Sequence, residues 1–242
     1  MSVFIKNRVR LIVAKYPILY IPLKKLQGKY GIIDKNTEIV IEGYPRCANS
    51  FAEAAFRVSQ NRNVNIAHHT HAPAQVVAAV RKRIPVILVF RNPDDAVVSR
   101  IIREKNISLK QAYKEYIWFY QSIYHIIDRC VLSNFETTTK SFGCIIQKVN
   151  DKYGVNFNIF DDFNPEMTQK AHNLVDNLSK NRIGKETNYT SSLLNTGKHI
   201  SVNHYVKEKE RFKRHIISNS PDSERVEAQR LFNILKSLDI TL

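Results

Sequence analysis

The sequence is poor in cysteine, in glycine and in acidic residues, and each shortage argues against a class of protein. Its 242 residues include three cysteines, Cys47, Cys130 and Cys144, and these form no CxxC pair. A disulfide framework and a zinc ribbon are therefore disfavoured, and a reducing, cytoplasmic location is expected. Seven glycines and eight prolines argue against a collagen-like or low-complexity chain.

Long apolar runs are also missing. Lys15 and Lys24 bracket the longest candidate, Tyr16–Leu23, which is far shorter than the ~20 residues of a membrane span. Residues 4–26 are too short in their apolar part and lack a small-residue cleavage site, so no signal peptide is expected. Contact of the basic and apolar segment 1–35 with a membrane surface stays open as an alternative.

Positive charge is in excess, with 37 lysines and arginines against 22 acidic residues, a net charge of +15. Such an excess suits nucleic acid, an anionic membrane or a small polyanionic ligand. The densest stretch, Lys207–Arg214, also holds Glu208 and Glu210, and no zinc-finger or RNP-type signature is present. We therefore expect no nucleic-acid partner. With 43% hydrophobic residues, the chain should fold as one globular domain, 1–242.

Short β-rich runs alternate with amphipathic helical stretches. Strands are expected at Glu38–Ile41, Pro85–Phe90 and Cys130–Phe135. Residues 182–205 are expected to form a loop. Helices are expected from Ser50 onward and over 74–83, 94–103, 109–127, 141–153, 167–178 and 223–238. This order predicts an α/β fold, a parallel sheet flanked by helices in three layers.

The strongest local signal is Gly43–Ser50, where the first strand passes through a turn into a helix. Free backbone N–H groups and the helix dipole make such a turn an anion site. Laid on the P-loop pattern GxxxxGK[ST], the second glycine becomes Ala48 and the lysine becomes Asn49, whereas Ser50 fits. Hydrolysis of ATP or GTP is therefore disfavoured, but a phosphate cradle with its cation at Arg46 is favoured. A positive φ at Ala48 would be strained.

A second signal follows the next strand, at Arg91–Ser99 (RNPDDAVVS). Asn92 can cap a helix whose first residue is Pro93, which leaves Arg91 at the carboxyl edge of the sheet. Ligands of open α/β sheets bind at that edge. Ser99 lies about two helical turns further on, and it can share one phosphate with a loop arginine only if the chain folds back.

Together these segments resemble the sulfotransferases that use 3′-phosphoadenosine 5′-phosphosulfate (PAPS), whose loops read YPKSGTTW and RNPxDxxVS. Here they read YPRCANSF (44–51) and RNPDDAVVS (91–99), with HTHAP (69–73) between them and NFE (134–136) and KYGVNF (152–157) after them. The resemblance covers roughly residues 38–160. It implies a P-loop NTPase-like fold with a nucleotide-binding core at 38–160 and a helical and loop C-terminal part at 161–242.

The resemblance also implies a role for each matching residue. Residues of the first loop bind the 5′-phosphosulfate, and Arg91 with Ser99 binds the 3′-phosphate. Arg46 takes the place of the family's lysine, which neutralises the leaving oxygen. His71 matches the general base that takes the proton of an acceptor hydroxyl, which we expect on a carbohydrate. PAPS is the co-substrate and no metal is implied. The first-loop residues are Arg46, Cys47, Ala48, Asn49, Ser50 and Phe51.

Several alternatives stay open. Arg46 and Arg91 could instead pair with Asp94 or Glu53, and Glu53 could replace His71 as the base. A metal site at His68, His69 and His71 is disfavoured because adjacent histidines point in different directions. In 113–124, Trp118 and Phe119 are expected in the core, and exposed tyrosines could line an acceptor groove. Thr196–Lys198 is a distant candidate for a loop that closes over the nucleotide.

Two other function classes are weighed against the enzyme. One is a basic α/β protein that binds a polyanion without catalysis, either nucleic acid or an anionic membrane. The other is a small-molecule kinase, which the absent Walker lysine disfavours.

Overall fold

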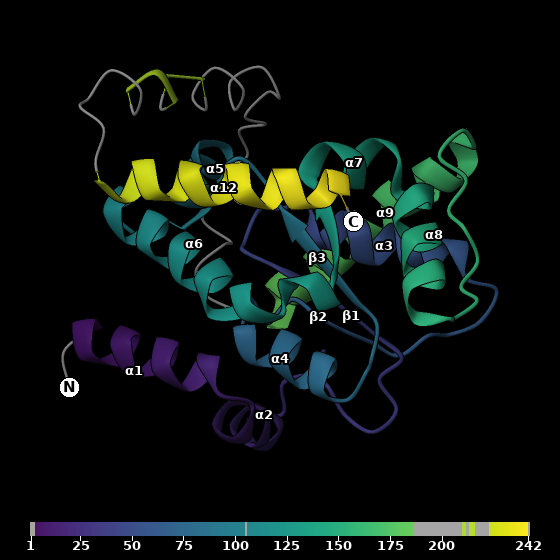
Figure 1. Cartoon of the computed structure of the whole chain (residues 1–242), viewed down its shortest axis with the longest axis horizontal. Helices are drawn as coiled ribbons and strands as arrows, with labels where there is room; N and C mark the ends of the chain where they lie inside the picture. Colours follow the sequence, from purple (N-terminus) through teal and green to yellow (C-terminus); the bar gives the residue numbers. More distant parts are fainter. Residues whose placement is uncertain (1–2, 105, 186–209, 212, 216–222, 242) are drawn as a thin grey trace.

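The computed structural model describes residues 3–104, 106–185, 210–211, 213–215 and 223–241 (Figure 1). Its centre is a sheet of four parallel strands in the order β2-β1-β3-β4. Every residue of β1 and β3 is buried, as expected for strands covered on both faces. The strands are β1 (Ile39–Gly43), β2 (Ile66–His68), β3 (Val86–Phe90) and β4 (Val131–Asn134).

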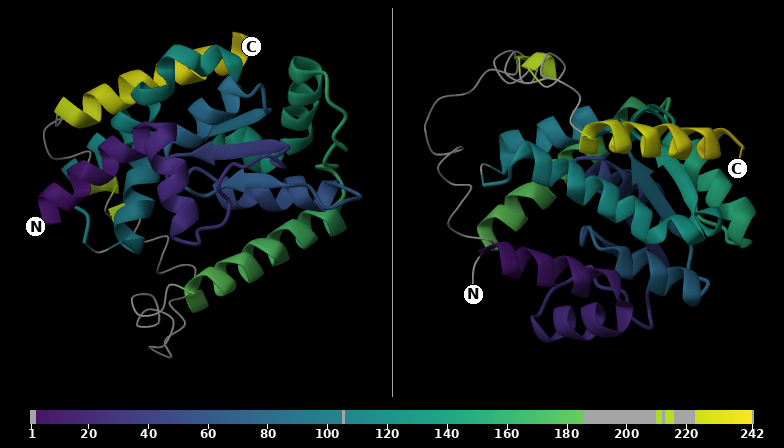
Figure 2. Two further views of the ribbon diagram at one scale, coloured as in Figure 1. Left: turned by 90° about the horizontal axis from the view of Figure 1, so that it is seen from below. Right: turned by 60° about the vertical axis from the view of Figure 1, so that its left-hand side comes forward.

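Helices cover both faces of this sheet (Figures 1 and 2). On one face α3 and α8 contact the strands and α9 packs along α3, while α4 contacts β1, β3 and α6 on the other. α12 returns from the C-terminal part to pack along α6 and β4. Their bounds are α3 (Asn49–Ser59), α4 (Pro73–Arg81), α5 (Pro93–Arg103), α6 (Leu109–Ile123), α7 (Phe135–Lys140), α8 (Phe142–Tyr153), α9 (Pro165–Lys185) and α12 (Ser223–Thr241).

The strand order contains one switch point, between β1 and β3. From β1 the chain crosses to β2 on one side, and from β2 it returns past β1 to β3 on the other. In open α/β sheets, ligands bind at such a switch point, at the carboxyl ends of the strands. Gly43, the last residue of β1, pairs with Val89, so the loops after the two strands start side by side.

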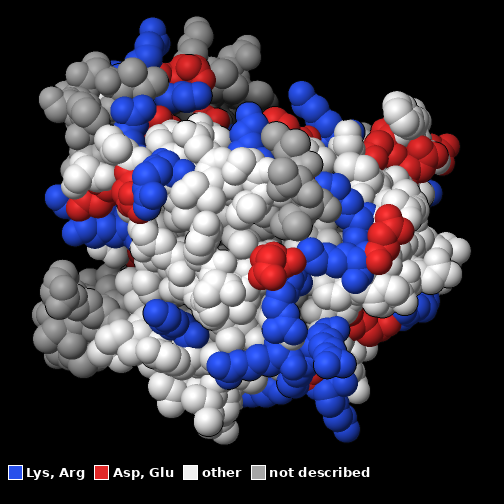
Figure 3. Space-filling model, viewed as in Figure 1, with Lys and Arg blue, Asp and Glu red and all other residues white. Residues whose placement is uncertain are grey.

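The N-terminal segment folds onto this body as two helices, α1 (Val3–Lys15) and α2 (Pro17–Leu26). Ala14 and Tyr20 are buried against Ala72 and Ala74, at the start of α4. The segment is thus packed against the domain on one side. None of the described helices combines the length and the apolar character that a membrane crossing requires. On the face seen in Figure 3, many of the lysine and arginine side chains gather in a band that runs from the right of centre to the bottom, with acidic side chains beside it.

The predicted elements agree with the structure, with four differences. The predicted strand 130–135 is shorter because Asn134 caps α7, its side chain accepting from the Thr137 N–H at 2.9 Å. The predicted helix 109–127 ends at Ile123, and a 3₁₀ helix, η1 (Tyr124–Arg129), leads into β4. Elements that were not predicted form the third difference. β2 has only three residues, too few to show the alternation of a strand, and α1, α2 and α7 were not predicted either.

The fourth difference lies at α9. Asn164 starts it by accepting from the N–H groups of Glu166 and Met167 at 3.0 and 3.1 Å, and the helix continues to Lys185. The loop prediction is therefore wrong for 182–185, which continue the helix even though Gly184 is a poor helix former. The remainder of that prediction, 186–205, lies outside the described residues, and so does Thr196–Lys198.

Candidate functional site

The loop between β1 and α3 holds two residues in the left-handed region, Arg46 at φ 69° and Ala48 at φ 73°. Ala48 is the N-cap of α3, and it has a positive φ, the conformation that is strained for an alanine. The loop is fixed from within because the side-chain amide of Asn49 donates to the Tyr44 carbonyl at 3.0 Å. Two non-glycine residues in this conformation store backbone strain in one loop, a feature that clusters at ligand-binding sites.

The loop after β3 follows the predicted pattern. Asn92 caps α5 by accepting from the Asp94 N–H at 3.0 Å, and Pro93 is the first helical residue. Ser99 is buried on the same helix. This geometry leaves Arg91 at the carboxyl edge of the sheet, beside the first loop.

The two loops meet through their arginines. Arg46 Nε donates to Ser99 Oγ at 3.0 Å, and Arg91 Nη1 donates to the Arg46 carbonyl at 3.2 Å. The Arg91 guanidinium stacks on the Phe135 ring, 3.7 Å from its centre. Its Nε is buried and has no hydrogen-bond partner within the described part of the chain. The structure therefore links both Arg91 and Ser99 to Arg46.

The alternative ion pairs of these arginines are not formed. Asp94 is engaged by Arg225, with Nη2 and Oδ2 2.7 Å apart, and Glu53 by Arg57, with Nε and Oε1 3.0 Å apart. Reading Arg46 and Arg91 as partners of these two carboxylates is therefore wrong.

Buried tyrosines of α6 hold both loops in place. Tyr116 donates to the Arg91 carbonyl at 2.8 Å, and Tyr113 donates to Asp94 at 2.6 Å. Tyr120 donates to the Val89 carbonyl at 2.9 Å and accepts from the Tyr44 N–H at 3.3 Å. A role in lining an acceptor groove was open only to exposed tyrosines of this helix, and these three are buried. Their spacing of three and four residues is a signal that they share one inward face.

The histidine segment is anchored by Glu42, a fully buried carboxylate on β1. Glu42 accepts from the N–H and the hydroxyl of Thr70 at 2.8 and 2.7 Å and from the His71 N–H at 3.0 Å. Burial raises the pKa of Glu42 to about 7, although these hydrogen bonds act in the opposite direction. Nothing in the sequence pattern singled out Glu42, because a glutamate near the end of a strand normally faces solvent.

His71 lies within hydrogen-bond distance of the first loop. Its Nδ1 is 2.7 Å from the Gly43 carbonyl, and because a carbonyl oxygen can only accept, Nδ1 carries the proton. In the neutral ring Nε2 is then the basic nitrogen. His71 and His69 both have positive φ, 50° and 58°. This conformation turns the segment so that a histidine from it reaches the end of β1.

His68 and His69 converge on Glu53. Their Nδ1 atoms lie 3.0 Å apart and 3.0 and 3.2 Å from Glu53 Oε2, and His69 Nε2 lies 2.9 Å from Ser50 Oγ. The premise that adjacent histidines diverge is wrong here, because the left-handed backbone at His69 breaks the strand alternation. Among described residues, these three are the ones that could hold a metal ion. Two imidazoles and one carboxylate are ligands that zinc accepts.

Glu53 is unsuited to replace His71 as a base. Burial alone raises its pKa, but the hydrogen bonds from His68 and His69 outweigh burial and hold the pKa well below its usual range. A carboxylate so stabilised is a weak proton acceptor. Cys47 is equally unsuited to nucleophilic chemistry, since burial raises the pKa of its thiol to about 12.

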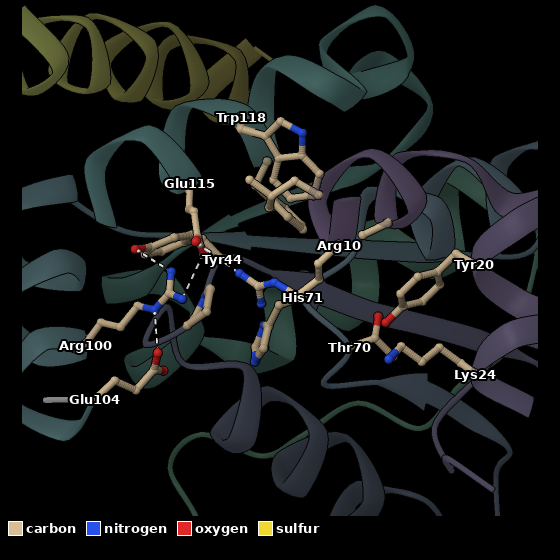
Figure 4. A pocket seen from close by; sticks show the side chains of 14 residues that line it. Arg10, Tyr20, Lys24, Tyr44, Thr70, His71, Arg100, Glu104, Glu115 and Trp118 are labelled. Carbon is tan, nitrogen blue, oxygen red and sulfur yellow. Dashed lines mark hydrogen bonds and ion pairs between the residues drawn. The ribbon is translucent and has the colours of Figure 1, made fainter. Parts of the chain in front are cut away.

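A cavity of about 240 Å³ opens beside His71 (Figure 4). Arg100 crosses its wall, donating to Glu115 at 2.9 Å and to the Tyr44 hydroxyl at 3.0 Å. Trp118 and Phe119, expected in the core, contribute to this wall, so the cavity combines aromatic surface with charged groups. It is lined by Arg10, Leu11, Ala14, Tyr20, Lys24, Tyr44, Pro45, Thr70, His71, Arg100, Glu104, Glu115, Trp118 and Phe119.

The site joins the strained loop after β1 to Arg91 and Ser99, and it places a histidine that faces a cavity beside that loop. Comparison with known proteins adds no assignment: no protein-family model matches the sequence, and no curated protein matches it closely enough to be a relative.

Proposed function

We propose that this chain is a PAPS-dependent sulfotransferase with the P-loop-like fold of that family, which transfers a sulfuryl group to a hydroxyl. The observation that carries the proposal is the meeting of Arg46, Arg91 and Ser99 at the switch point of the sheet. Arg46, on the loop after β1, is linked by direct hydrogen bonds to Arg91, on the loop after β3, and to Ser99 of α5, both more than forty positions away in the sequence. The adenosine bisphosphate part of PAPS carries phosphates at two positions, and the site offers two arginines at the place where such ligands bind.

The donor groups suit that ligand. The backbone from Arg46 to Ser50 opens onto the N-terminus of α3, whose N–H groups and dipole favour a 5′-phosphosulfate. Arg91 supplies a buried N–H that lacks an acceptor among described residues. Leaving such a donor unsatisfied costs about 1–3 kcal/mol, and a bound 3′-phosphate would remove that cost.

His71 acts on the acceptor hydroxyl, and Arg46 acts on the leaving group. His71 Nε2 takes the proton of the acceptor hydroxyl while that oxygen forms a bond to sulfur. The bond between sulfur and the bridging oxygen of the 5′-phosphate breaks, and its electron pair stays on that oxygen. Arg46 stabilises the charge that develops on the departing bisphosphate through forked hydrogen bonds. The Gly43 carbonyl keeps His71 in the required tautomer.

The cavity beside His71 is the proposed acceptor site. Tyr20, Tyr44 and Trp118 give it aromatic walls, and Arg100 with Glu115 gives it charged hydrogen-bonding groups. Sugar rings pack on aromatic faces and use polar groups for orientation, so a carbohydrate hydroxyl fits this lining. The net charge of +15 favours approach of an anionic donor.

A thermal-shift titration with adenosine 3′,5′-bisphosphate, with AMP and ATP as controls, tests the proposal. A ligand that binds only the folded state raises the melting temperature. Arg91→Ala should lose most of the shift produced by the bisphosphate, whereas Arg81→Ala, an exposed arginine at the end of α4, should keep it. His71→Ala should keep the shift but lose transfer of labelled sulfate to saccharide acceptors by at least ~100-fold, the usual scale of general-base catalysis.

Equal shifts for the bisphosphate and AMP, or a full shift in Arg91→Ala, would contradict the 3′-phosphate site. The alternative of a polyanion-binding protein without catalysis would then be preferred. Transfer retained by His71→Ala would place the base elsewhere while leaving the nucleotide site intact.

A further inference from the structure

We propose that the helix pair α1–α2 docks onto the surface of a membrane that contains anionic lipids. The N-terminal segment has an unusual charge composition: residues 1–33 contain no aspartate or glutamate, and they contain seven lysines and arginines. These are Lys6, Arg8, Arg10, Lys15, Lys24, Lys25 and Lys29.

The same helices expose most of the large apolar side chains that are exposed in the described chain. Of twelve such side chains, eight lie between residues 9 and 30. Ile18 and Leu26 are 82% and 86% exposed. The full set is Val9, Ile12, Tyr16, Ile18, Leu19, Leu23, Leu26 and Tyr30. A concentration of exposed apolar side chains in one short segment marks a site of interaction.

The opposite side of the pair is already occupied. Ala14 and Tyr20 are buried against Ala72 and Ala74, with Trp118 packed beside them. The exposed residues are therefore not an unfinished core contact within the described chain. In Figure 3 the described surface at the lower left, over α1 and α2, is mostly white, and a few lysine and arginine side chains adjoin it.

The positive charge beside these apolar side chains favours an anionic lipid surface as the partner of the helix pair. Lys15, Lys25 and Lys29 are exposed beside the apolar side chains. Interfaces between proteins are depleted of lysine, whereas interfacial helices combine apolar residues with lysine and arginine. Each lysine or arginine near an anionic leaflet contributes about 1 kcal/mol of attraction. Neither helix is long enough to span a bilayer, so the pair would lie on its surface.

Mutual repulsion of these cations is visible at Lys24. Burial lowers the pKa of Lys24, and the neighbouring charges of Lys29 and Arg10 lower it further. Anionic headgroups would relieve that repulsion. A second copy of this chain would add the same positive charges to it.

Docking would also place the cavity beside His71 close to the membrane surface. Arg10, Leu11 and Ala14 of α1 and Tyr20 and Lys24 of α2 line that cavity, so it lies next to the docked helices. Under the proposed function, on which this consequence rests, the acceptor is a carbohydrate hydroxyl carried by a membrane-borne amphiphile. Docking itself does not depend on the reaction.

Flotation of the full chain with vesicles tests the docking. We expect it to float with vesicles of 70% phosphatidylcholine and 30% phosphatidylglycerol, and at least ~10-fold less with phosphatidylcholine alone. Ile18→Glu with Leu26→Glu should reduce the bound fraction at least ~10-fold, and both side chains are exposed, so folding should be preserved. The matched control is Phe163→Glu, which is 97% exposed and lies outside the helix pair.

Charge is tested separately. Lys25→Glu with Lys29→Glu should reduce binding to the anionic vesicles, whereas Lys152→Glu with Lys170→Glu, two exposed lysines elsewhere, should leave it unchanged. Absence of flotation, or flotation unchanged in the helix-pair variants, would overturn the proposal. So would a dimer that forms in solution and is lost in those variants. The bisphosphate melting shift, measured on the same variants, reports failure of the nucleotide site independently of docking.

Discussion

At the scale of single residues, the site depends on a buried carboxylate that the proposed reaction does not consume. Glu42 holds the backbone of Thr70 and His71, and His71 in turn reaches the Gly43 carbonyl. The left-handed conformation of His71 persists because these contacts determine it. Glu42 is therefore a positioning residue for His71.

The raised pKa of Glu42 predicts a measurable pH dependence. Its pKa rises from 4.5 to about 7 on folding, so the native state binds more protons than the unfolded state between these values. The Glu42 contribution to unfolding free energy is then largest below pH 4.5 and is lost as the pH rises through 7, by roughly 3 kcal/mol in total. Glu42→Gln lacks this titration, so its stability relative to wild type should improve between pH 5 and pH 8.

Urea unfolding of wild type and Glu42→Gln across that range measures the difference. Glu166→Gln, at an exposed position of α9, is the control and should run parallel to wild type. A constant difference between wild type and Glu42→Gln would show that Glu42 does not titrate in this window.

At the scale of elements, the helix starts could be predicted because their signals are local. The Asn92 cap and Pro93 fixed the start of α5, and the loop before Ser50 fixed the start of α3 within one residue. The convergence of His68 and His69 could not be predicted, because it depends on the left-handed backbone of His69 and on the distant Glu42 and Glu53. A sequence pattern places adjacent residues of a strand on opposite faces of the sheet. Here tertiary contacts bring the side chains of His68 and His69 to the same carboxylate.

The left-handed N-cap of α3 predicts an unusual response to glycine. An alanine in this conformation costs roughly 1–2 kcal/mol, which glycine does not incur, while glycine gives back up to ~1 kcal/mol through unfolded-state entropy. Ala48→Gly should therefore raise the unfolding free energy by up to about 1 kcal/mol. Ala52→Gly, buried in the first turns of the same helix, should lower it by at least ~1 kcal/mol. Urea midpoints of the two variants decide the matter, and equal destabilisation would mean that the Ala48 backbone is not strained.

At the scale of the whole molecule, the parallel α/β class followed from the alternation of elements, but the strand order did not. β2 has three residues, and the switch point exists only because β2 and β3 lie on opposite sides of β1. The loops that hold Arg46 and Arg91 could be picked out from the sequence as candidate ligand-binding loops. The hydrogen bond of Arg91 to the Arg46 carbonyl could not, because it requires the completed sheet. The N-terminal helices were read as a basic and apolar segment, and their packing on α4 depends on Tyr20 and Ala14, which no periodicity distinguished.

The sulfotransferase and the polyanion-binding protein should differ in how ligand affinity depends on salt, because the molecule carries a large net positive charge. A nucleotide held by Arg46 and Arg91 in a cleft is screened weakly, so its affinity should fall about tenfold or less between 50 and 200 mM salt. Polyanion binding over the charged surface should fall far more, roughly 10³-fold for about six phosphate contacts. Titrations with adenosine 3′,5′-bisphosphate and with a 20-base-pair DNA duplex at both salt concentrations compare these slopes. Weak dependence for the bisphosphate, together with salt-labile DNA binding, is the result expected of the enzyme. Tight, sequence-independent DNA binding at 200 mM salt, with no bisphosphate binding at either concentration, would identify the basic surface as the functional one.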